Sequence, residues 1–317
     1  MKDSQKKHQP KAEKKILSKD NLLITFSILF AVFSIAIIAD AYIRFWIWQN
    51  SILRSPVKEI SLSSYPQLAG KLSPDITAQA AVAIDDGSKT VLYGKNENLR
   101  FSMASTTKIM SALVALDYFN PDDVITIYST DVEPVVVGFP ALEKVYFIDT
   151  MYAMLLPSGN DAALAIAQNY PGGEKAFVQK MNEKAKSLSL INTHFEDSSG
   201  LSDNNYSTPL EMARLASVAL KNKTFAQIVS TQRRVITNVT GNHTYKLVSL
   251  DQLLGKDGIT GVKTGFTNEA GGVLITSQEA NGKRFIIVVM KSQNRFLDIE
   301  KILSQVEGNV TFVSNPL

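Results

Sequence analysis

The chain has 317 residues, no cysteine, three histidines and a formal net charge of +3 at pH 7. Without cysteine it can form neither a disulfide framework nor a thiolate nucleophile, and the three histidines lack the spacing of a zinc-peptidase motif. No metal or other cofactor is therefore expected. The first 20 residues carry seven lysines and three acidic residues, which leaves the rest of the chain close to neutral. Because no basic stripe remains there, nucleic acid is not an expected partner.

Residues 1–20 are predicted to be a cytoplasmic lysine-rich tail, and residues 21–48 a transmembrane signal anchor. The uncharged run from Leu22 to Ala39 has 18 residues, and a helix of that length spans roughly 27 Å, enough to cross the hydrocarbon core. The lysines before this run favour a cytoplasmic N-terminus, and the aromatic residues after it are typical of the interfacial belt. We therefore expect a single-pass protein of the cell membrane whose remaining residues are extracytoplasmic. A cleaved signal peptide is the alternative, because residues 39–41 have the A-x-A form of a cleavage site.

Residues 49–75 are rich in serine and proline and contain few large apolar side chains, which predicts a spacer. The remainder, residues 76–317, is predicted to be one folded domain. Its first two strands are expected at residues 80–84 and 90–93, joined by an Asp-Asp-Gly-Ser turn.

Helical patterns then dominate from residue 105 to 220. Strand patterns return over four segments, 234–239, 259–264, 273–277 and 285–290. A helix over about 294–306 is expected to close the chain. This order predicts an α+β fold, in which an antiparallel sheet flanked by helices lies beside a mostly helical subdomain.

Ser105 and Lys108 form an S-x-x-K pair at the start of an apolar helical pattern. The same pattern occurs at residues 4–7 and 55–58, but neither of these begins such a helix. Residues three apart lie on one face of a helix, so Lys108 is placed beside the Ser105 hydroxyl. A lysine in apolar surroundings has a depressed pKa, which is what a lysine base needs to activate a serine nucleophile. A serine that merely caps the helix is the alternative interpretation.

Ser158 and Asn160 form an S-x-N pair in a Pro-Ser-Gly-Asn turn between two apolar segments. Such a turn would hold a hydroxyl and an amide at the edge of a cleft, although it could also be an ordinary turn. Two other S-x-N pairs occur, at residues 202–204 and 292–294. The first of them reads S-D-N and competes for the same role, but its polar surroundings predict a surface loop. We therefore prefer Ser158.

Lys263, Thr264 and Gly265 form the one K-T-G triplet of the chain. The alternation over residues 259–264 predicts a strand with Lys263 pointing to one face. Gly265 would allow a substrate backbone to lie close against this strand. A solvated lysine on an edge strand is the alternative interpretation.

Together the three motifs resemble the D-alanyl-D-alanine carboxypeptidases, which are low-molecular-mass penicillin-binding proteins of the S11 peptidase family. The segments M-A-S-T-T-K-I-M, L-L-P-S-G-N-D-A-A and G-V-K-T-G-F-T are close to the usual wording of that family. The resemblance covers most of residues 76–291 and implies a β-lactamase/transpeptidase-like catalytic domain over residues 76–317. It also implies a serine-type D-Ala-D-Ala carboxypeptidase that trims peptidoglycan stem peptides, with β-lactams as covalent inhibitors.

The resemblance assigns catalytic roles to three side chains. Ser105 would attack the carbonyl between two D-alanines, and Lys108 would accept its proton. Ser158, together with Lys263, would relay a proton to the leaving amine. Water would then cleave the acyl-enzyme.

The resemblance also implies the substrate contacts. Asn160 would bind the substrate amide and order the lysine base, while Lys263 and Thr264 would hold the terminal carboxylate. Gly265 belongs to the same substrate-binding strand. The backbone N–H of Phe266, together with that of the nucleophile, would form the oxyanion hole.

Three other functions compete with this one. A D,D-endopeptidase or a transpeptidase would use the same acyl-enzyme. A β-lactamase would need a glutamate for deacylation, and the nearest candidate, Glu196, lacks the expected E-x-x-L-N surroundings. A catalytically silent wall-binding module is the third, and the intact motifs argue against it, because a fold alone does not require them.

Overall fold

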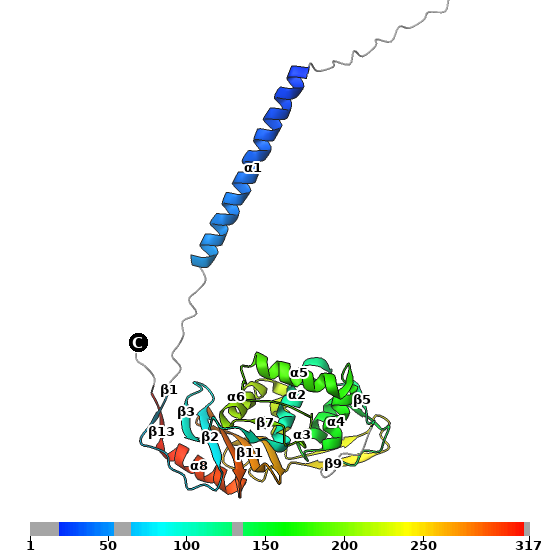
Figure 1. Cartoon of the computed structure of the whole chain (residues 1–317), viewed down its shortest axis with the longest axis vertical. Helices are drawn as coiled ribbons and strands as arrows, with labels where there is room; N and C mark the ends of the chain where they lie inside the picture. The colour runs from blue at the N-terminus through cyan, green and yellow to red at the C-terminus, as the bar shows by residue number, and fades with distance from the viewer. Residues whose placement is uncertain (1–18, 54–64, 129–135, 314–317) are drawn as a thin grey trace, which may run out of the picture. The chain divides into compact units, whose positions relative to one another are not determined.

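The computed structural model describes residues 19–53, 65–128 and 136–313. The chain divides into two compact units, Met1–Ser61 and Leu62–Leu317. Figure 1 shows the one described helix of the first unit, α1, and the folded second unit.

Helix α1, Lys19–Leu53, contains the apolar run that the sequence predicted to be helical. Within it, Phe26–Ile47 has 22 residues with a mean hydropathy of 2.2, long and apolar enough to cross a membrane by length and composition. A signal sequence near an N-terminus has the same properties. The helix continues past the predicted end of the anchor at residue 48. The predicted lysine-rich tail lies outside the described residues except for its last two positions.

Residues from 65 onward, within the range predicted to be a spacer, already make contacts of the second unit. Strand β1, Tyr65–Leu68, pairs antiparallel with β13, Val310–Val313. Leu72 is buried in the apolar cluster around helix α8, Arg295–Asn309. Because β13 follows α8, the last helix does not close the chain as predicted. A local pattern cannot reveal β1, because its pairing partner is at the other end of the chain.

A five-stranded antiparallel sheet forms the centre of this unit, in the order β10-β11-β12-β2-β3. The strands are β2 (Ala80–Asp85), β3 (Val91–Lys95), β10 (Ile259–Thr267), β11 (Gly271–Ala280) and β12 (Lys283–Ser292). Both faces of the sheet are covered, so alternate residues of one strand enter different cores. In β12, Ile286 and Val288 join one core, while Phe285 and Ile287 join the other. This is why the central strands are nearly continuous apolar runs.

The turn between β11 and β12 has the predicted two-residue form. Asn281 and Gly282 have φ values of +51° and +70°. Two consecutive positive φ values are what a tight hairpin of right-handed twist requires, and Asn-Gly meets that requirement with little strain. The Asn-Gly dipeptide therefore fixes the register of two strands in the centre of the sheet.

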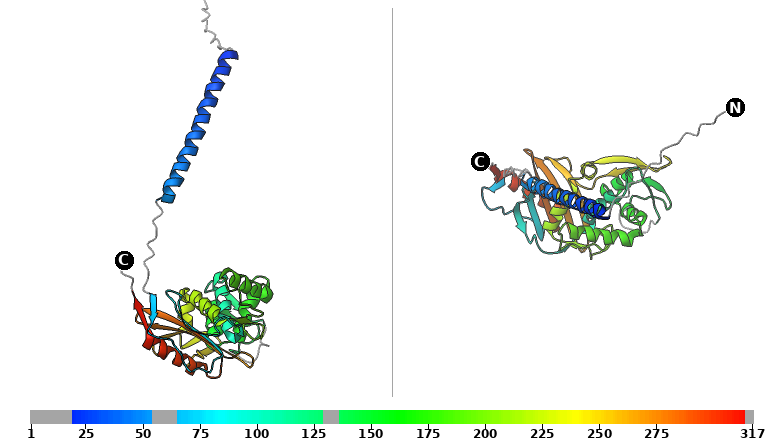
Figure 2. Two further views of the ribbon diagram at one scale, coloured as in Figure 1. Left: turned by 60° about the vertical axis from the view of Figure 1, so that its left-hand side comes forward. Right: turned by 90° about the horizontal axis from the view of Figure 1, so that it is seen from above.

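Helix α8 covers one face of the sheet and a mostly helical subdomain covers the other (Figure 2). The helices of the subdomain are η1 (Ala104–Thr107), α2 (Lys108–Tyr118), α3 (Phe147–Leu155), α4 (Asn160–Asn169), α5 (Gly173–Ser187), α6 (Pro209–Ala219) and α7 (Lys223–Val229). Two of them, α6 and α7, begin at a side chain that caps the helix. For α6, Thr208 Oγ1 accepts from the backbone N–H of Glu211 at 3.1 Å, and Pro209 occupies the first turn.

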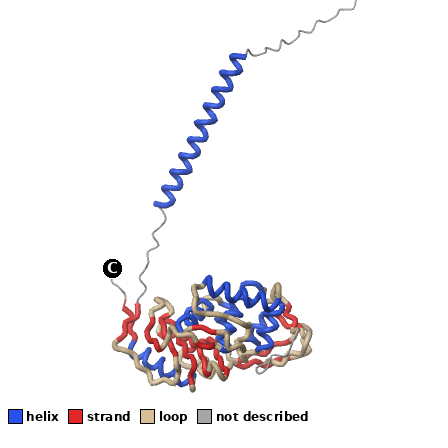
Figure 3. Tube along the Cα trace, viewed as in Figure 1, coloured by secondary structure: helices blue, strands red, loops and turns tan. Residues whose placement is uncertain are grey.

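Three short antiparallel pairs complete the unit (Figure 3). They are β4 (Phe101–Ser102) with β7 (Tyr206–Ser207), β5 (Val124–Thr126) with β6 (Lys144–Tyr146), and β8 (Arg233–Thr237) with β9 (Thr244–Val248). The predicted architecture is confirmed: an antiparallel sheet with helices on its faces lies beside a helical subdomain. Edge strand β10 carries the K-T-G triplet and borders η1, which carries Ser105.

Candidate active site

Ser105 lies in the short turn η1, and Lys108 is the first residue of the helix that follows. Lys108 Nζ donates a hydrogen bond to Ser105 Oγ at 3.1 Å. The N-cap positions of η1 and α2 are other residues, and neither makes a side-chain cap hydrogen bond. Ser105 is therefore not a capping serine, and its hydroxyl faces the lysine as predicted.

The backbone just before the candidate nucleophile is strained. Ala104 has a φ of +47°, a left-handed conformation that costs a non-glycine residue about 1–2 kcal/mol. A Cβ added to Gly200 would overlap the Ala104 carbonyl oxygen, so the loop around Gly200 presses directly against this residue. Packing from two sides holds the strained residue in place, and strain of this kind is typical of functional sites.

Lys108 is fully buried, and its ammonium nitrogen has three acceptors. Besides the Ser105 hydroxyl, it donates to Asn160 Oδ1 at 2.7 Å and to the carbonyl oxygen of Ser199 at 2.6 Å. Burial lowers the pKa of Lys108 to about 7, although the charges of Asp197 and Asp161 act in the opposite direction. A lysine with such a pKa is available as a neutral base at physiological pH.

Ser158 occupies the sharp turn between α3 and α4, and Asn160 begins α4. Ser158 has a φ of +66° and is buried. A Cβ on Gly159 would lie 2.7 Å from a methyl carbon of Val137 and 2.9 Å from the carbonyl oxygen of Ala153. Only glycine fits there, so the Pro-Ser-Gly-Asn sequence produces a turn tight enough to place both polar side chains inside the site.

Lys263 projects from β10 to the same place, where its Nζ donates to Ser158 Oγ at 2.9 Å and to the carbonyl oxygen of Thr264 at 2.9 Å. It is buried, so it is not a solvated edge lysine. Burial, followed by the nearby charges of Lys108 and Arg295, holds the pKa of Lys263 well below its usual range, while Asp251 opposes this shift. The structure therefore brings two lysines with depressed pKa values to one site.

Gly265 packs closely against the segment that carries Ser105. A Cβ at this position would lie 3.1 Å from the Met103 carbonyl oxygen and 3.2 Å from the Ser105 nitrogen. Close packing of β10 on η1 therefore favours glycine here, and room for a substrate backbone stays a prediction. This packing brings the backbone of the K-T-G strand beside the backbone N–H of Ser105.

A pocket of about 310 Å³ opens at this junction. Three of its lining residues were predicted site residues, namely Ser105, Asn160 and Phe266. The other four were not singled out by the sequence: Gly200, Leu201, Thr267 and Asn268. Phe266 is 62% exposed at its rim. Thr264, also predicted, is buried beside Lys263 in β10.

The S-D-N rival at residues 202–204 does not reach the lysines. Ser202 Oγ accepts a hydrogen bond from the backbone N–H of Asn204 within its own loop, at 3.2 Å. Its loop still contributes to the site through the carbonyl oxygen of Ser199, which sequence patterns could not reveal because a carbonyl carries no residue signature. Ser158 is thus the S-x-N serine that meets Lys263.

Arg295 was missed by sequence reasoning. It lies at the start of α8, and its Nη1 donates to the Gly265 carbonyl oxygen at 3.3 Å. A single arginine at the start of a helical pattern gives no signal in the sequence, because its contact with β10 forms only when α8 covers the sheet.

Glu196, the candidate for a β-lactamase, is exposed and contacts His194 at 3.3 Å. It does not line the pocket at Ser105.

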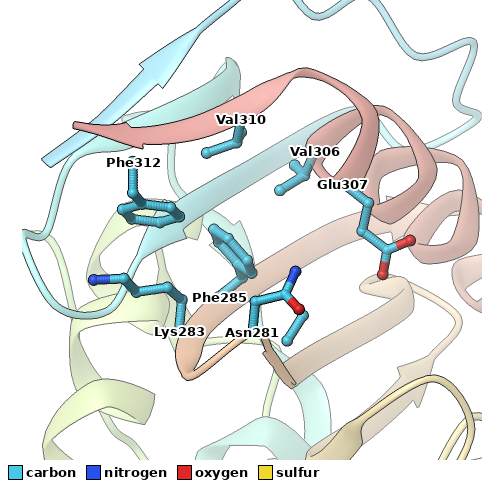
Figure 4. Close-up of a pocket in the computed structure, with 8 residues that line it drawn as sticks. Asn281, Lys283, Phe285, Val306, Glu307, Val310 and Phe312 are labelled. Atoms are coloured by element: carbon cyan, nitrogen blue, oxygen red, sulfur yellow. The ribbon is translucent and has the colours of Figure 1, made fainter. Parts of the chain in front are cut away.

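Another pocket, of about 450 Å³, contains none of the motif residues. Figure 4 shows it between β12, α8 and β13, with Phe285 and Phe312 on its apolar side and Glu307 at one end. Lys283 Nζ lies 4.5 Å from the centre of the Phe312 ring. Because it lacks a nucleophile paired with a base, this pocket is not the candidate active site.

The fold and the site define a class. Penicillin-recognising serine enzymes have this arrangement, in which a serine nucleophile and a lysine base lie between an antiparallel sheet and a helical subdomain. A family profile described as D-alanyl-D-alanine carboxypeptidase, peptidase S11, matches residues 68–294. The chain belongs to this family of serine peptidases.

Several known proteins are similar to the chain. A D-alanyl-D-alanine carboxypeptidase of Streptomyces sp. (strain K15) is 35% identical over 254 residues, which cover 73% of this chain and 87% of that protein. A D-alanyl-D-alanine endopeptidase of Pseudomonas aeruginosa is 31% identical, covering 80% and 85%. The crystal structure of the Streptomyces K15 DD-transpeptidase matches with a TM-score of 0.71 at 35% identity, covering 75% of this chain and 99% of that one.

Proposed function

We propose that this enzyme is a serine-type D-Ala-D-Ala carboxypeptidase that trims peptidoglycan stem peptides through an acyl-enzyme on Ser105. The observation that carries the proposal is the 3.1 Å hydrogen bond from Lys108 Nζ to Ser105 Oγ. Burial lowers the pKa of that lysine to about 7, so a substantial fraction of it is neutral near pH 7, and in that form the same contact allows Lys108 Nζ to accept the Ser105 proton.

In the acylation step, Ser105 Oγ attacks the carbonyl carbon of the penultimate D-alanine while its proton passes to Lys108. The carbon–nitrogen bond then breaks, and the leaving amine takes up the proton that Lys108 accepted, by relay through Ser158, whose hydroxyl is bonded to Lys263. D-Alanine leaves, an ester remains on Ser105, and Lys108 is neutral again. A water molecule attacks this ester and gives a proton to Lys108, which returns it to Ser105 Oγ as the ester bond breaks.

Substrate binding in this proposal uses the remaining motif residues. Asn160 holds the substrate amide, and Lys263 with Thr264 holds the terminal carboxylate. An arriving carboxylate favours the charged form of Lys263, so binding draws a proton to this lysine. The backbone N–H groups of Ser105 and Phe266 stabilise the oxyanion, and removal of one such donor typically lowers kcat about 10²–10³-fold.

The same acyl-enzyme can pass to an acceptor other than water, or can form on a cross-linked peptide. The Pseudomonas aeruginosa relative is called an endopeptidase and the Streptomyces structure a DD-transpeptidase. Endopeptidase action is therefore the second candidate. The two are separated by whether free D-alanine is released from a peptide ending in D-Ala-D-Ala or a cross-linked dimer is cleaved.

We also propose that α1 anchors the enzyme in the cell membrane, with the N-terminus cytoplasmic and the catalytic unit outside. The length and hydropathy of Phe26–Ile47 support anchoring, and the lysines among residues 1–20 support the orientation. The mass of the protein recovered from membranes tests this: an intact N-terminus supports the anchor, whereas loss of the first 40 or so residues would identify a cleaved signal peptide.

The function is tested with the full-length protein in detergent and its Ser105→Ala variant. Each is mixed with benzylpenicillin, and intact mass is followed with time. We expect a lasting adduct on Ser105 and none on the variant, followed by D-alanine release from a peptide ending in D-Ala-D-Ala. An adduct that vanishes within seconds while penicillin is hydrolysed would indicate a β-lactamase, and no adduct on the folded protein would refute Ser105 as the nucleophile.

A further inference from the structure

The loop that supplies the Ser199 carbonyl oxygen to Lys108 is organised by one carboxylate. Asp197 Oδ1 accepts hydrogen bonds from the backbone N–H groups of Ser199 at 2.7 Å and Gly200 at 2.5 Å. Its Oδ2 accepts from the backbone N–H of Ser202 at 2.6 Å. Three amides of one loop therefore converge on a single side chain, and these charge-assisted hydrogen bonds hold the pKa of Asp197 below its usual range even though burial opposes this.

A second buried side chain ties this loop to the candidate nucleophile. Asn205 Nδ2 donates to Asp197 Oδ2 at 2.8 Å, and Asn205 Oδ1 accepts from the backbone N–H of Glu196 at 2.9 Å. The Asn205 carbonyl oxygen accepts from the backbone N–H of Met103 at 3.2 Å, two residues before Ser105. The loop is thus bonded both to itself and to the segment that carries the nucleophile.

We propose that Asp197 is a positioning residue for the lysine base. Because its carboxylate accepts hydrogen bonds from the loop amides, it holds the Ser199 carbonyl oxygen against Lys108 Nζ and holds Gly200 against Ala104. Asp197 lines no part of the pocket at Ser105, so it acts through these neighbours and not on the substrate. The inference rests on the proposed function, because it assigns a role in the acylation of Ser105.

The carboxylate also acts on Lys108 through its charge. The groups that influence this lysine come from several elements: Asp197 from the loop, Asp161 from α4 and Lys263 from β10. Glu174 of α5 is coupled to Asp197 in turn. Removal of the Asp197 charge removes one of the two carboxylates that favour the charged form of Lys108, and loss of the Ser199 acceptor acts in the same direction. Both effects lower the pKa of the base.

The test measures how fast benzylpenicillin acylates Ser105 across pH 4.5–9, using full-length wild type, Asp197→Asn and a matched control, Asp298→Asn. Asp298 is also a buried carboxylate that accepts backbone amides, from Thr77 at 2.9 Å and Ala78 at 2.8 Å. It is not among the groups that influence Lys108. The control therefore reproduces the loss of a buried, hydrogen-bonded carboxylate without the proposed role.

For Asp197→Asn we expect the acidic limb of the acylation profile to move down by about one pH unit, since a nearby charge shifts a pKa by about that amount. We also expect the maximal rate to fall by roughly 10²-fold, the usual cost of a misplaced catalytic group. Asp298→Asn should lower the melting temperature and leave the limb in place. The inference is overturned if Asp197→Asn keeps the wild-type limb and loses no more rate than the control.

Two further measurements cover variants that react poorly. If Asp197→Asn does not fold, Asn205→Ala is measured instead. This variant removes one hydrogen bond to the Asp197 carboxylate and keeps the carboxylate charge, so it should lower the maximal acylation rate at least tenfold. An unchanged rate overturns the inference. If Asp197→Asn folds but acylates too slowly, the titration of Lys108 is followed by NMR in the Ser105→Ala background, where a lowered pKa supports the inference and an unchanged pKa overturns it. Failure of wild type to acylate would instead refute the proposed function.

Discussion

Lys263 Nζ and Ser158 Oγ lie 2.9 Å apart although 105 positions separate them in the chain. This hydrogen bond joins the edge strand of the sheet to the helical subdomain at the place where Lys108 meets Ser105. The helical subdomain carries Ser105, Lys108 and Ser158, and the sheet contributes Lys263. Only their junction brings the second lysine to the Ser158 hydroxyl.

The packing of the loop on the nucleophile segment predicts a large difference between two glycine substitutions. Gly200 and Gly138 have nearly equal φ values of +87° and +88°, but only Gly200 has neighbours within reach of a Cβ among the residues that the structure describes. Gly138→Ala should cost about 1 kcal/mol of the free energy of unfolding, from backbone strain alone. Gly200→Ala should cost at least about 3 kcal/mol, because overpacking adds to the strain.

Urea unfolding of both glycine variants checks this difference, and benzylpenicillin acylation reports the site. Gly200→Ala should lose most of its acylation, since Ala104 and Ser105 must shift. Equal stabilities of the two variants would show that the loop does not press on Ala104.

The left-handed backbone of Ser158, at φ +66°, predicts that two substitutions lower activity alike but differ in stability. Ser158→Ala and Ser158→Gly both remove the hydroxyl that accepts from Lys263, so both should lower acylation on the order of 10²-fold, the usual scale for a proton-transfer group. Glycine adopts this conformation without strain, so Ser158→Gly should be more stable than Ser158→Ala by about 1 kcal/mol. Thermal unfolding decides, and a more stable alanine variant would contradict the strained geometry.

The depressed pKa of Lys108, about 7, predicts how stability depends on pH. The unfolded chain holds this proton up to the ordinary lysine pKa, near 10.4, whereas the folded chain releases it near 7. Between these values the unfolded state binds more protons, so the stability of wild type relative to Lys108→Met should rise with pH from about 7 to 10. Below pH 7 the difference should be constant. Urea unfolding of both proteins at several pH values measures it, and a difference that does not change with pH would place the lysine pKa elsewhere.

The pairing of β1 with β13 predicts where the catalytic unit can be cut. A protein of residues 62–317 retains β1 and should be soluble, folded and acylated by benzylpenicillin at the full-length rate. A protein of residues 76–317 follows the boundary that the sequence suggested, but it leaves β13 unpaired and removes Leu72 from its core. It should melt several degrees lower, because one lost apolar side chain of this size costs about 2–5 kcal/mol. Equal melting temperatures would show that residues 62–75 are only a spacer.

Part of the site follows from local rules. Ser105 and Lys108 are three residues apart on a helical pattern, so their contact depends only on the period of the helix. The Asn-Gly turn and the apolar strands beside it are similarly local, and the structure has them where they were predicted. The resemblance to one family added the pairing of Ser158 with Lys263, which spacing alone would not have chosen over the S-D-N rival.

The sequence by itself therefore determined the motifs, the contact of Ser105 with Lys108, the α+β architecture and the apolar N-terminal helix, because each depends on residues close together in the chain. The tertiary structure alone decided the pairing of β1 with β13, the contact of Arg295 with β10 and the hydrogen bonds of Asp197 and Ser199. It also showed the close packing of Gly265 on the segment that carries Ser105. These features depend on backbone groups and on partners far away in the sequence, and neither leaves a periodic pattern of side chains that could be recognised beforehand.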